Sequence, residues 1–458
     1  MQAKQRIMQI IYQTAKPFDQ LLKKQKMVAG QIYRPMYYVV EQPVDEGLLL
    51  YHTMTKALLL LTPEEAEIYK TNPTALPQLV EQWFLVPQSH DDRLLSLQIR
   101  DVAKMLEKSS DAITHYTILP TTDCNARCFY CYELGHPRVP MSEDTAIKTA
   151  DYIINHCQGK KVWINWFGGE PLFNKHAITQ ICQRLKEGGI EYSSSMITNG
   201  YLFNDDTVKE AKELWHLKWV QITLDGTEKI YNRCKAFIYK DVNAYQRVVS
   251  NIHRLQDADI AIRIRLNIDM HNADNLMELT EELHQEFRET KGINVYAHPL
   301  FEEEKGSKAM LDDQNRTFIY ERMKELRALL DTYHFIKPIK LDRKVTTNVC
   351  QADSDHSAII MPSGHIGKCE HYSEDHFIGH VDNEECDLEM IARFKERREE
   401  IEACATCPSY PFCNMLKLCA TSTKCHPETR NEKKQKIRYG MLHAYQQYLT
   451  HQQDEVQN

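Results

Sequence analysis

Residues 121–133 read TTDCNARCFYCYE and place three cysteines, Cys124, Cys128 and Cys131, in the spacing CxxxCxxC. Three thiolates this close together in sequence can bind three corners of a four-iron, four-sulfur cluster, which normally takes four cysteines. The pattern therefore predicts a cluster with one iron open to another ligand. The alternatives are a zinc site, which usually takes four ligands as two separated pairs, and three unrelated thiols.

The length and composition of the chain limit the classes of protein that it can belong to. At 458 residues it is too long for one ordinary domain, so two or three domains are expected. Its net charge of −8 argues against a nucleic-acid partner, because surfaces that bind phosphate are usually basic. No segment approaches the roughly 20 apolar residues that span a bilayer, and the N-terminus lacks the features of a signal peptide. We therefore expect a cytoplasmic protein with no membrane partner.

The cysteines are distributed in groups. Residues 1–123 contain none, 124–131 contain three and 350–425 contain eight of the fourteen. In a large chain without a secretion signal, such groups indicate metal binding or catalysis rather than disulfides. Three further cysteines stand alone and are interpreted as ordinary core or helix residues: Cys157, Cys182 and Cys234.

Residues 1–112 are predicted to form a separate module. Two apolar runs flank the turn VDEG at 44–47 and predict a pair of strands. Thr62 is suited to cap a helix, and residues 92–109 form an amphipathic helical pattern. Strands and short helices in so few residues predict a winged-helix-like module, and no residue in it looks catalytic.

Residues 113–335 are predicted to form an open barrel. Six strand-like segments alternate with helical patterns up to residue 300, which predicts parallel strands joined by crossover helices. Six such units are fewer than a full eightfold barrel contains, so we expect an α/β fold, a partial (β/α)6 TIM barrel. The cysteine loop and the motifs GGEP, TNG, LDG and NID follow the first five strands in turn. They are therefore expected to meet at the C-terminal ends of the strands, where such barrels carry their active sites.

The alternating pattern and the CxxxCxxC loop together resemble the core of the radical S-adenosylmethionine (SAM) superfamily. The resemblance implies that Cys124, Cys128 and Cys131 bind a [4Fe–4S] cluster whose open iron binds the amino and carboxylate groups of SAM. Reductive cleavage of SAM would then give a 5′-deoxyadenosyl radical, which abstracts hydrogen from unactivated carbon.

The same resemblance implies a set of SAM-binding residues. Tyr130, before the third cysteine, would lie beside the adenine, and the backbone of the GGEP motif would meet the SAM amino group. Glycine allows such a close backbone approach. Asn199 would lie on the ribose or carboxylate side, and Arg233 would pair with the SAM carboxylate. The GGEP motif comprises Gly168, Gly169, Glu170 and Pro171.

The C-terminal cysteines, within predicted domain 336–430, resemble a SPASM extension. The chain reads C-x13-G-x4-C from Cys350 and C-x2-C-x5-C-x5-C-x5-C from Cys404, with five residues before Cys419 where three are usual. The resemblance implies two auxiliary [4Fe–4S] clusters, the first with an open iron or with Cys386 as an extra ligand. A zinc ribbon is the alternative. The implied ligands are Cys350, Cys369 and Cys419 for the first cluster, and Cys404, Cys407, Cys413 and Cys425 for the second.

One acidic residue and the C-terminal segment also have predicted roles. Glu370 follows Cys369 where sulfatase-maturing relatives carry a catalytic aspartate. It would either deprotonate the substrate during oxidation or be an ordinary surface residue. Residues 431–458 are predicted to form a polar helix that ends in a loose acidic tail.

The resemblance implies a radical SAM/SPASM maturase of ribosomally made peptides. The N-terminal module would bind the leader of a precursor peptide as an added strand, and the barrel would install a thioether or carbon–carbon crosslink. A flavodoxin or ferredoxin is the usual electron donor in this family. Two alternatives remain at this point: an anaerobic sulfatase-maturing enzyme, and a non-enzymatic iron–sulfur or zinc protein. The long segment ahead of the cysteine loop counts against the first.

Overall fold

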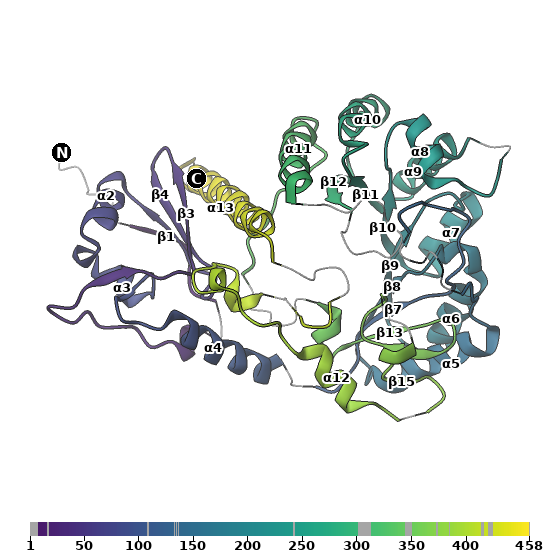
Figure 1. The fold of residues 1–458 in the computed structure, drawn as a ribbon, viewed down its shortest axis with the longest axis horizontal. Helices are drawn as coiled ribbons and strands as arrows, with labels where there is room; N and C mark the ends of the chain where they lie inside the picture. Colours follow the sequence, from purple (N-terminus) through teal and green to yellow (C-terminus); the bar gives the residue numbers. More distant parts are fainter. Residues whose placement is uncertain are drawn as a thin grey trace.

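The fold was obtained as a computed structural model, with its two larger sheets at opposite ends of the molecule. In Figure 1 the N-terminal module (purple) and the barrel (teal) face each other, and the cysteine-rich segment (yellow-green) lies between them. The structure describes residues 8–15, 18–107, 110–131, 133, 135, 137–240, 243–300, 313–343, 350–371, 374–383, 385–413, 416–419 and 425–457.

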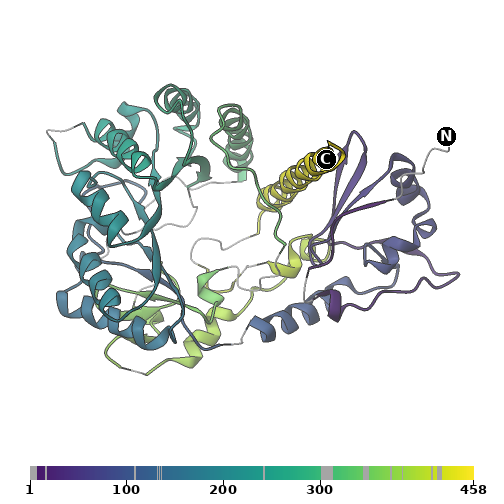
Figure 2. The ribbon, with the colours of Figure 1, turned by 180° about the vertical axis from the view of Figure 1, so that it is seen from behind.

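The predicted partial barrel is confirmed. Its strands pair in parallel and in chain order, and Figure 2 shows helices along their outer side. The strands are β7 (His115–Ile118), β8 (Val162–Trp166), β9 (Tyr192–Thr198), β10 (Leu217–Thr223), β11 (Ala261–Ile268) and β12 (Ile293–Pro299). The helices are α5 (Glu143–His156), α6 (Lys175–Glu187), α7 (Asp205–Glu213), α8 (Glu228–Lys235), α9 (Ala244–Asp257), α10 (Ala273–Glu286) and α11 (Asp313–Thr332).

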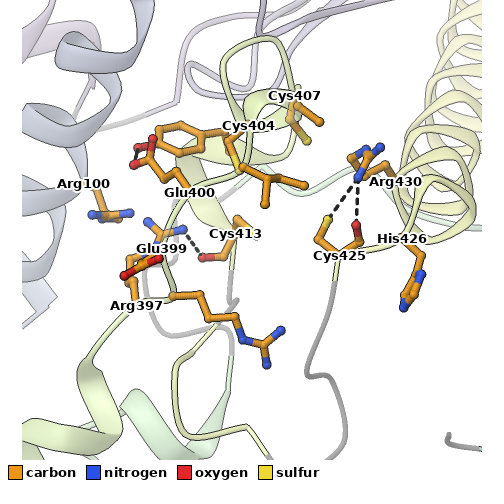
Figure 3. A pocket seen from close by; sticks show the side chains of 14 residues that line it. Arg100, Arg397, Glu399, Glu400, Cys404, Cys407, Cys413, Cys425, His426 and Arg430 are labelled. Atoms are coloured by element: carbon orange, nitrogen blue, oxygen red, sulfur yellow. Dashed lines mark hydrogen bonds between the residues drawn. The ribbon is translucent and has the colours of Figure 1, made fainter.

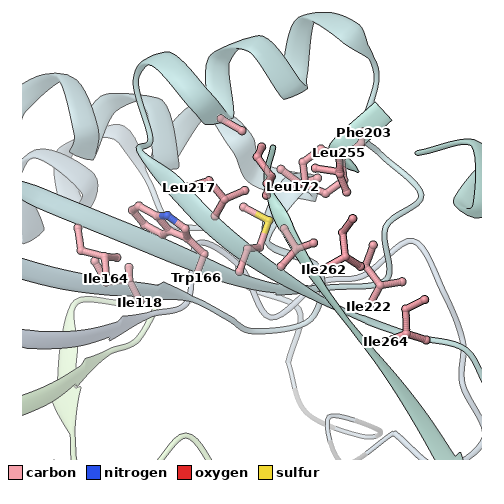
Figure 4. Close-up of a cluster of buried hydrophobic side chains, with 14 of the residues drawn as sticks. Ile118, Ile164, Trp166, Leu172, Phe203, Leu217, Ile222, Leu255, Ile262 and Ile264 are labelled. Carbon is pink, nitrogen blue, oxygen red and sulfur yellow. The ribbon is translucent and has the colours of Figure 1, made fainter. Parts of the chain in front are cut away.

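The barrel is stabilised by the apolar layer between strands and helices. Alternate residues of β11, such as Ile262 and Ile264, point into this layer, as expected for a strand with one face toward helices. Trp166, at the end of β8, is fully buried in the same cluster (Figure 4). Each fully buried side chain of this size contributes about 1.5–3 kcal/mol, so the layer fixes the positions of the strand ends.

The cysteine-rich segment extends the barrel sheet. Strand β13 (Ser357–Ile360) pairs in parallel with β7, and β14 (His365–Gly367) and β15 (Gly379–His380) follow antiparallel. Within the described residues the sheet therefore has nine strands and crosses the predicted boundary at residue 335. Helix α12 (Leu388–Lys395) follows. Short 3-10 helices are η1 (Pro73–Ala75), η2 (Pro171–Asn174), η3 (Gln351–Asp353), η4 (Glu374–His376), η5 (Glu402–Cys404) and η6 (Tyr410–Phe412).

The N-terminal module is an antiparallel sheet with helices against it. Its strand order is β1-β5-β4-β3, and a separate pair joins β2 to β6. Thr62 caps α2 as predicted: Glu65 N donates to Thr62 Oγ1 at 3.2 Å, and Thr62 N donates to Glu65 Oε2 at 3.0 Å. The strands are β1 (Gln9–Tyr12), β2 (Tyr33–Pro35), β3 (Val39–Val44), β4 (Gly47–His52), β5 (Leu58–Leu61) and β6 (Leu85–Pro87). The helices are α1 (Phe18–Leu21), α2 (Pro63–Thr71), α3 (Pro77–Glu81) and α4 (Asp92–Glu107).

The C-terminal helix α13 (Pro427–Gln457) belongs to this module by its packing. Its residues Met441 and Tyr445 cover one face of the N-terminal sheet, including Leu49 and Leu58, while α2 and α3 cover the other face. The prediction of a loose tail is wrong, because the helix continues to Gln457 and residues 451–457 contain no glycine or proline that would stop it. Among the described residues, no helix has the length and apolar character needed to cross a bilayer.

Candidate functional site

The cysteine loop after β7 is fastened to the GGEP loop after β8. Gly169 N donates to Thr121 O at 3.1 Å, and Glu170 N donates to Asp123 O at 2.9 Å. Ala126 N points at Cys124 Sγ at 3.3 Å. Main-chain hydrogen bonds therefore hold the loop that carries the three thiols against the neighbouring strand end.

The two glycines of GGEP make this approach possible. Gly168 has φ +112°, and a Cβ there would lie 2.3 Å from Thr121 O. A Cβ at Gly169 would lie 2.4 Å from Asp123 O. Both distances are far inside van der Waals contact with backbone, which cannot rotate away as a side chain can. The residue type at these positions thus sets the position of the cysteine loop.

Replacing Gly168 by alanine is expected to displace the cysteine loop and lower iron binding and SAM cleavage by about tenfold or more, since active sites depend on sub-ångström placement. Iron content and 5′-deoxyadenosine release measure the effect. Gly159→Ala is the matched control, because Gly159 also has positive φ, +70°, but open space around it. Equal losses in the two variants would show that backbone strain, not the contact with the loop, is responsible.

Glu170 ties the loops after β8 and β9 together from inside. Its fully buried carboxylate accepts hydrogen bonds from Asn199 N at 2.7 Å, Thr198 Oγ1 at 2.8 Å and Leu172 N at 3.2 Å. Burial raises the pKa of Glu170 to about 7. The side chain of Glu170 therefore points toward the loop after β9, and the main chain of the GGEP motif faces the cysteine loop.

The side chain of Asn199 contacts the same loop. Its Nδ2 donates to Asn125 Oδ1 at 2.6 Å and lies 3.7 Å from Cys124 Sγ, while its Oδ1 accepts from Tyr201 N at 3.0 Å. In this arrangement Asn199 positions Cys124. A role toward the ribose or carboxylate of SAM stays a prediction.

A buried ionic network lies beside the second and third cysteines, and sequence reasoning missed two of its members. Tyr130 OH donates to Asp225 Oδ2 at 2.6 Å, and Lys235 Nζ lies 2.9 Å from Asp225 Oδ2 and 2.8 Å from Tyr130 OH. Burial alone would lower the pKa of Lys235, but Asp225 and Tyr130 raise it well above its usual value. The signal available was the LDG motif, which places Asp225 at the barrel mouth.

A pocket of about 200 Å³ opens next to this network. Tyr130 and Arg233, both predicted to contact SAM, line it together with polar side chains from the ends of β10 and β11. Asp225 contributes to its wall, and the Oδ1 atom of Asp225 is buried without a hydrogen-bond partner. An unsatisfied buried polar atom calls for an explanation, and a polar molecule bound in this pocket would provide one. The added polar lining residues are Asn267, Asp269, His271 and Asn272.

The predicted cysteine groups come together in space. The thiols of Cys124, Cys128 and Cys131 interact electrostatically, and burial raises the pKa of Cys124 to about 12 and that of Cys131 to about 11. Cys369 interacts in the same way with Cys350 and Cys419, and burial raises its pKa to about 12. The side chain of Cys386 is exposed, and its charged neighbours are Lys368 and Asp387.

Glu370 lies beside the second of these groups. It interacts electrostatically with Cys369 and Cys350. Gln351 Nε2 donates to its Oε2 at 2.5 Å, and Thr117 Oγ1 on β7 donates to Gln351 Oε1 at 2.9 Å. A chain of side chains therefore connects Glu370 to the first barrel strand.

Four cysteines of the C-terminal group line one pocket of about 390 Å³ with several arginines (Figure 3). Arg430 Nη1 donates to Cys425 O at 3.0 Å and lies 3.6 Å from Cys425 Sγ, while Arg397 Nη2 donates to Cys413 O at 2.6 Å. Guanidinium groups beside thiolates would offset the negative charge of a bound cluster. These cysteines are Cys404, Cys407, Cys413 and Cys425.

Comparison with protein families decides the identity of the barrel. The family model described as Radical SAM superfamily matches residues 118–290. These residues form a radical SAM domain. The match includes the cysteine loop, the GGEP motif, Asn199 and Arg233. Comparison with curated protein sequences gives no match.

Solved structures show a similar fold. The structure of anSMEcpe with bound AdoMet is 14% identical, with a TM-score of 0.54, and covers 73% of this chain and 98% of that chain. A structure of anSMEcpe with bound AdoMet and the Cp18Cys peptide is 15% identical, with a TM-score of 0.53 and the same coverage. SuiB from Streptococcus suis is 13% identical, with a TM-score of 0.50, and covers 83% of this chain and 94% of that chain. At these identities the likeness establishes the fold.

The residues of the radical SAM domain fit a cluster with three protein ligands. The available ligands are the three thiols of the cysteine loop. Gly168 and Gly169 have no side chains, so the backbone of the GGEP motif lies directly against this loop. Among the described residues, no three His, Cys, Asp or Glu side chains lie close enough to bind a single metal ion. A four-iron cluster is larger than one ion, and each thiol binds a different corner of it. The thiols that bind a cluster therefore do not need to converge on a single point.

Proposed function

We propose that the chain is a radical SAM/SPASM peptide maturase that installs a thioether or carbon–carbon crosslink in a ribosomally made precursor peptide. One observation carries the proposal: the N-terminal module directly contacts the segment with the last cysteines. Thr53 Oγ1 donates to Pro408 O at 2.6 Å, Arg93 Nε lies 2.7 Å from Glu400 Oε2, and Tyr38 stacks on Tyr410. A peptide bound to this module is thereby directed toward the cysteines and the barrel.

The proposed cofactors are SAM and three [4Fe–4S] clusters. SAM, bound at the cluster of Cys124, Cys128 and Cys131, would supply the hydrogen-abstracting 5′-deoxyadenosyl radical. The chain itself orients the reactants. The GGEP main chain holds the cysteine loop, Tyr130 and Arg233 line the adjoining pocket, and we propose that Glu370 takes the proton released on oxidation.

The auxiliary clusters would be held by the two further cysteine groups. Cys350, Cys369 and Cys419 would bind the first cluster. The charged neighbours of Cys386 are Lys368 and Asp387 and not these three cysteines, so we propose that Cys386 is not a ligand and that one iron is open. The four cysteines of the arginine-lined pocket would bind the second. Clusters of this kind can accept the electron that the substrate loses in a net oxidation.

Co-expression under anaerobic conditions with each short open reading frame beside the gene tests the proposal. We expect one peptide to become lighter by two hydrogens per modified site, with fragmentation in tandem mass spectrometry blocked between the linked residues. Peptides of unchanged mass, in the presence of active SAM cleavage, would contradict crosslink formation.

An anaerobic sulfatase-maturing enzyme is the second candidate. Its support is the likeness to anSMEcpe, one of whose structures contains the Cp18Cys peptide. The same experiment separates the two: a single Cys or Ser converted to an aldehyde, which reacts with a hydrazide probe, would favour this second function.

We further propose a flavodoxin or ferredoxin as the electron donor and the cytoplasm as the location. All fourteen cysteines lie among the described residues and none of them forms a disulfide, which agrees with a reducing compartment. A net charge of −8 supports the expectation that nucleic acid is not a partner.

A further inference from the structure

The N-terminal sheet has two edges, and several main-chain groups of one of them, on β3, already have partners. On β3, Arg438 Nε of α13 donates to Glu41 O at 3.2 Å, so the groups of Glu41 face away from β4. Alternate residues of an antiparallel strand direct their main-chain groups to the same side, so Val39 and Pro43 share this edge. Val39 N donates to Met36 O at 3.1 Å.

The rest of the β3 edge offers little to an incoming strand. Pro43 has no N–H, and its carbonyl accepts from Gln42 Nε2 at 2.8 Å. Proline on an edge strand is one of the devices by which proteins prevent further strand pairing, and here the Arg438 side chain also occupies the carbonyl of Glu41. A peptide that adds to this sheet therefore has to use the other side, beyond β5.

The edge of β5 is occupied by the chain's own strand β1. Gln9 and Ile10 pair with Leu60 and Leu59, and the register shifts before Tyr12 pairs with Leu58. This bulge interrupts a strand of only four residues. Ile10 remains 45% exposed, so β1 is only partly integrated into the core.

The side chains of β1 show what an occupant of this edge contacts. Tyr448 OH of α13 donates to Gln9 Oε1 at 3.0 Å, and the guanidinium of Arg343 lies 4.3 Å from the ring centre of Tyr12. Ile11 and Tyr12 pack against the apolar cluster between α13 and the sheet. The edge therefore accepts an extended segment with aliphatic and aromatic residues on its α13 side.

We propose that β1 is an exchangeable strand, which closes the β5 edge in the free enzyme and is replaced there by an extended apolar segment of the substrate peptide. The inference rests on the proposed function for the nature of the substrate. Because β1 is part of the chain, it competes at a high effective concentration, so a free peptide of the same length binds poorly while β1 is present. A substrate that also contacts the barrel gains a second point of attachment and displaces it.

A synthetic peptide of residues 8–15, MQIIYQTA, is a probe that does not depend on knowing the substrate. Labelled for fluorescence anisotropy, it is expected to bind a chain lacking residues 1–13 about tenfold or more tightly than it binds the full chain. The peptide with Ile10→Pro and Tyr12→Pro lacks two N–H groups and is expected to bind neither chain. Retained 5′-deoxyadenosine release shows that the truncated chain is folded.

The matched control opens the opposite edge. A full chain with Pro43→Thr and Arg438→Gln is expected to bind the probe no better than the unaltered chain. Equal affinity of the probe for full and truncated chains, or binding gained in this control, would overturn the assignment of the β5 edge.

Hydrogen exchange on the full chain provides a measurement that needs no truncation. With the probe at a concentration that saturates the full chain in the anisotropy experiment, amides of β1 are expected to lose protection while those of β4 keep it. Unchanged protection of the β1 amides would refute strand exchange. Increased protection would also refute it, because it would indicate that the probe adds to the outer side of β1. If β1 exchanges but co-expression gives no modified peptide, the proposed function is refuted and strand exchange stands. If co-expression gives a modified peptide but β1 does not exchange, strand exchange is refuted and the proposed function stands.

Discussion

Replacing Cys124, Cys128 and Cys131 together by alanine is expected to lower SAM cleavage by a factor of about 1,000 or more. The three thiols come from one loop and are the ligands proposed for the cluster that binds SAM, so their loss removes the site itself. The other cysteine groups lie on different segments, so we expect their iron to be retained. 5′-Deoxyadenosine release under reducing, anaerobic conditions measures the activity, and iron content with electron paramagnetic resonance measures the clusters.

Cys182→Ala is the control for this experiment. Cys182 is fully buried in the barrel core on α6, so the substitution tests the loss of a buried thiol away from the loop. It is expected to retain SAM cleavage. Comparable cleavage by the triple variant would refute the assignment of the loop as the cluster site.

Replacing Lys235 by methionine is expected to lower the free energy of unfolding of the barrel by about 3–5 kcal/mol, because it leaves the carboxylate of Asp225 buried without its cation. It also removes the donor to Tyr130 OH and so releases a wall of the pocket. The double variant Asp225→Asn, Lys235→Met is expected to recover much of the stability. If the double variant recovers stability but not SAM affinity, the network of Tyr130, Asp225 and Lys235 has a role in the site as well as in folding.

Thermal unfolding and SAM binding measure these effects. Lys229→Met, at an exposed position on the same helix, is the matched control and is expected to change the unfolding free energy by less than about 0.5 kcal/mol. If Lys235→Met were as stable as Lys229→Met, the ion pair would contribute nothing to the fold.

Local sequence signals were sufficient to predict the barrel and its loops. A polar motif follows each of the first five of its strands, and parallel strands necessarily bring those motifs to one end. The cap at Thr62 was equally predictable, because the capping box depends on residues three apart. These features depend on neighbours in sequence.

Features that depend on distant residues were not predictable in this way. Strand β1 has four residues and becomes a strand only by pairing with β5. Helix α13 looks polar, yet Met441 and Tyr445 complete the core of a sheet formed by the other end of the chain. Lys235 gave no signal as a buried cation, because its partners lie on other loops.

Hydrogen abstraction from a peptide is tested most directly with a precursor peptide deuterated at its side-chain and α-carbons, incubated with the reconstituted enzyme, SAM and reductant. We expect 5′-deoxyadenosine that carries one deuterium atom from the peptide, together with a peptide that has lost one deuterium at the modified carbon. Unlabelled 5′-deoxyadenosine with an intact peptide would contradict hydrogen abstraction from a peptide substrate, and no 5′-deoxyadenosine at all would favour a non-enzymatic iron–sulfur protein.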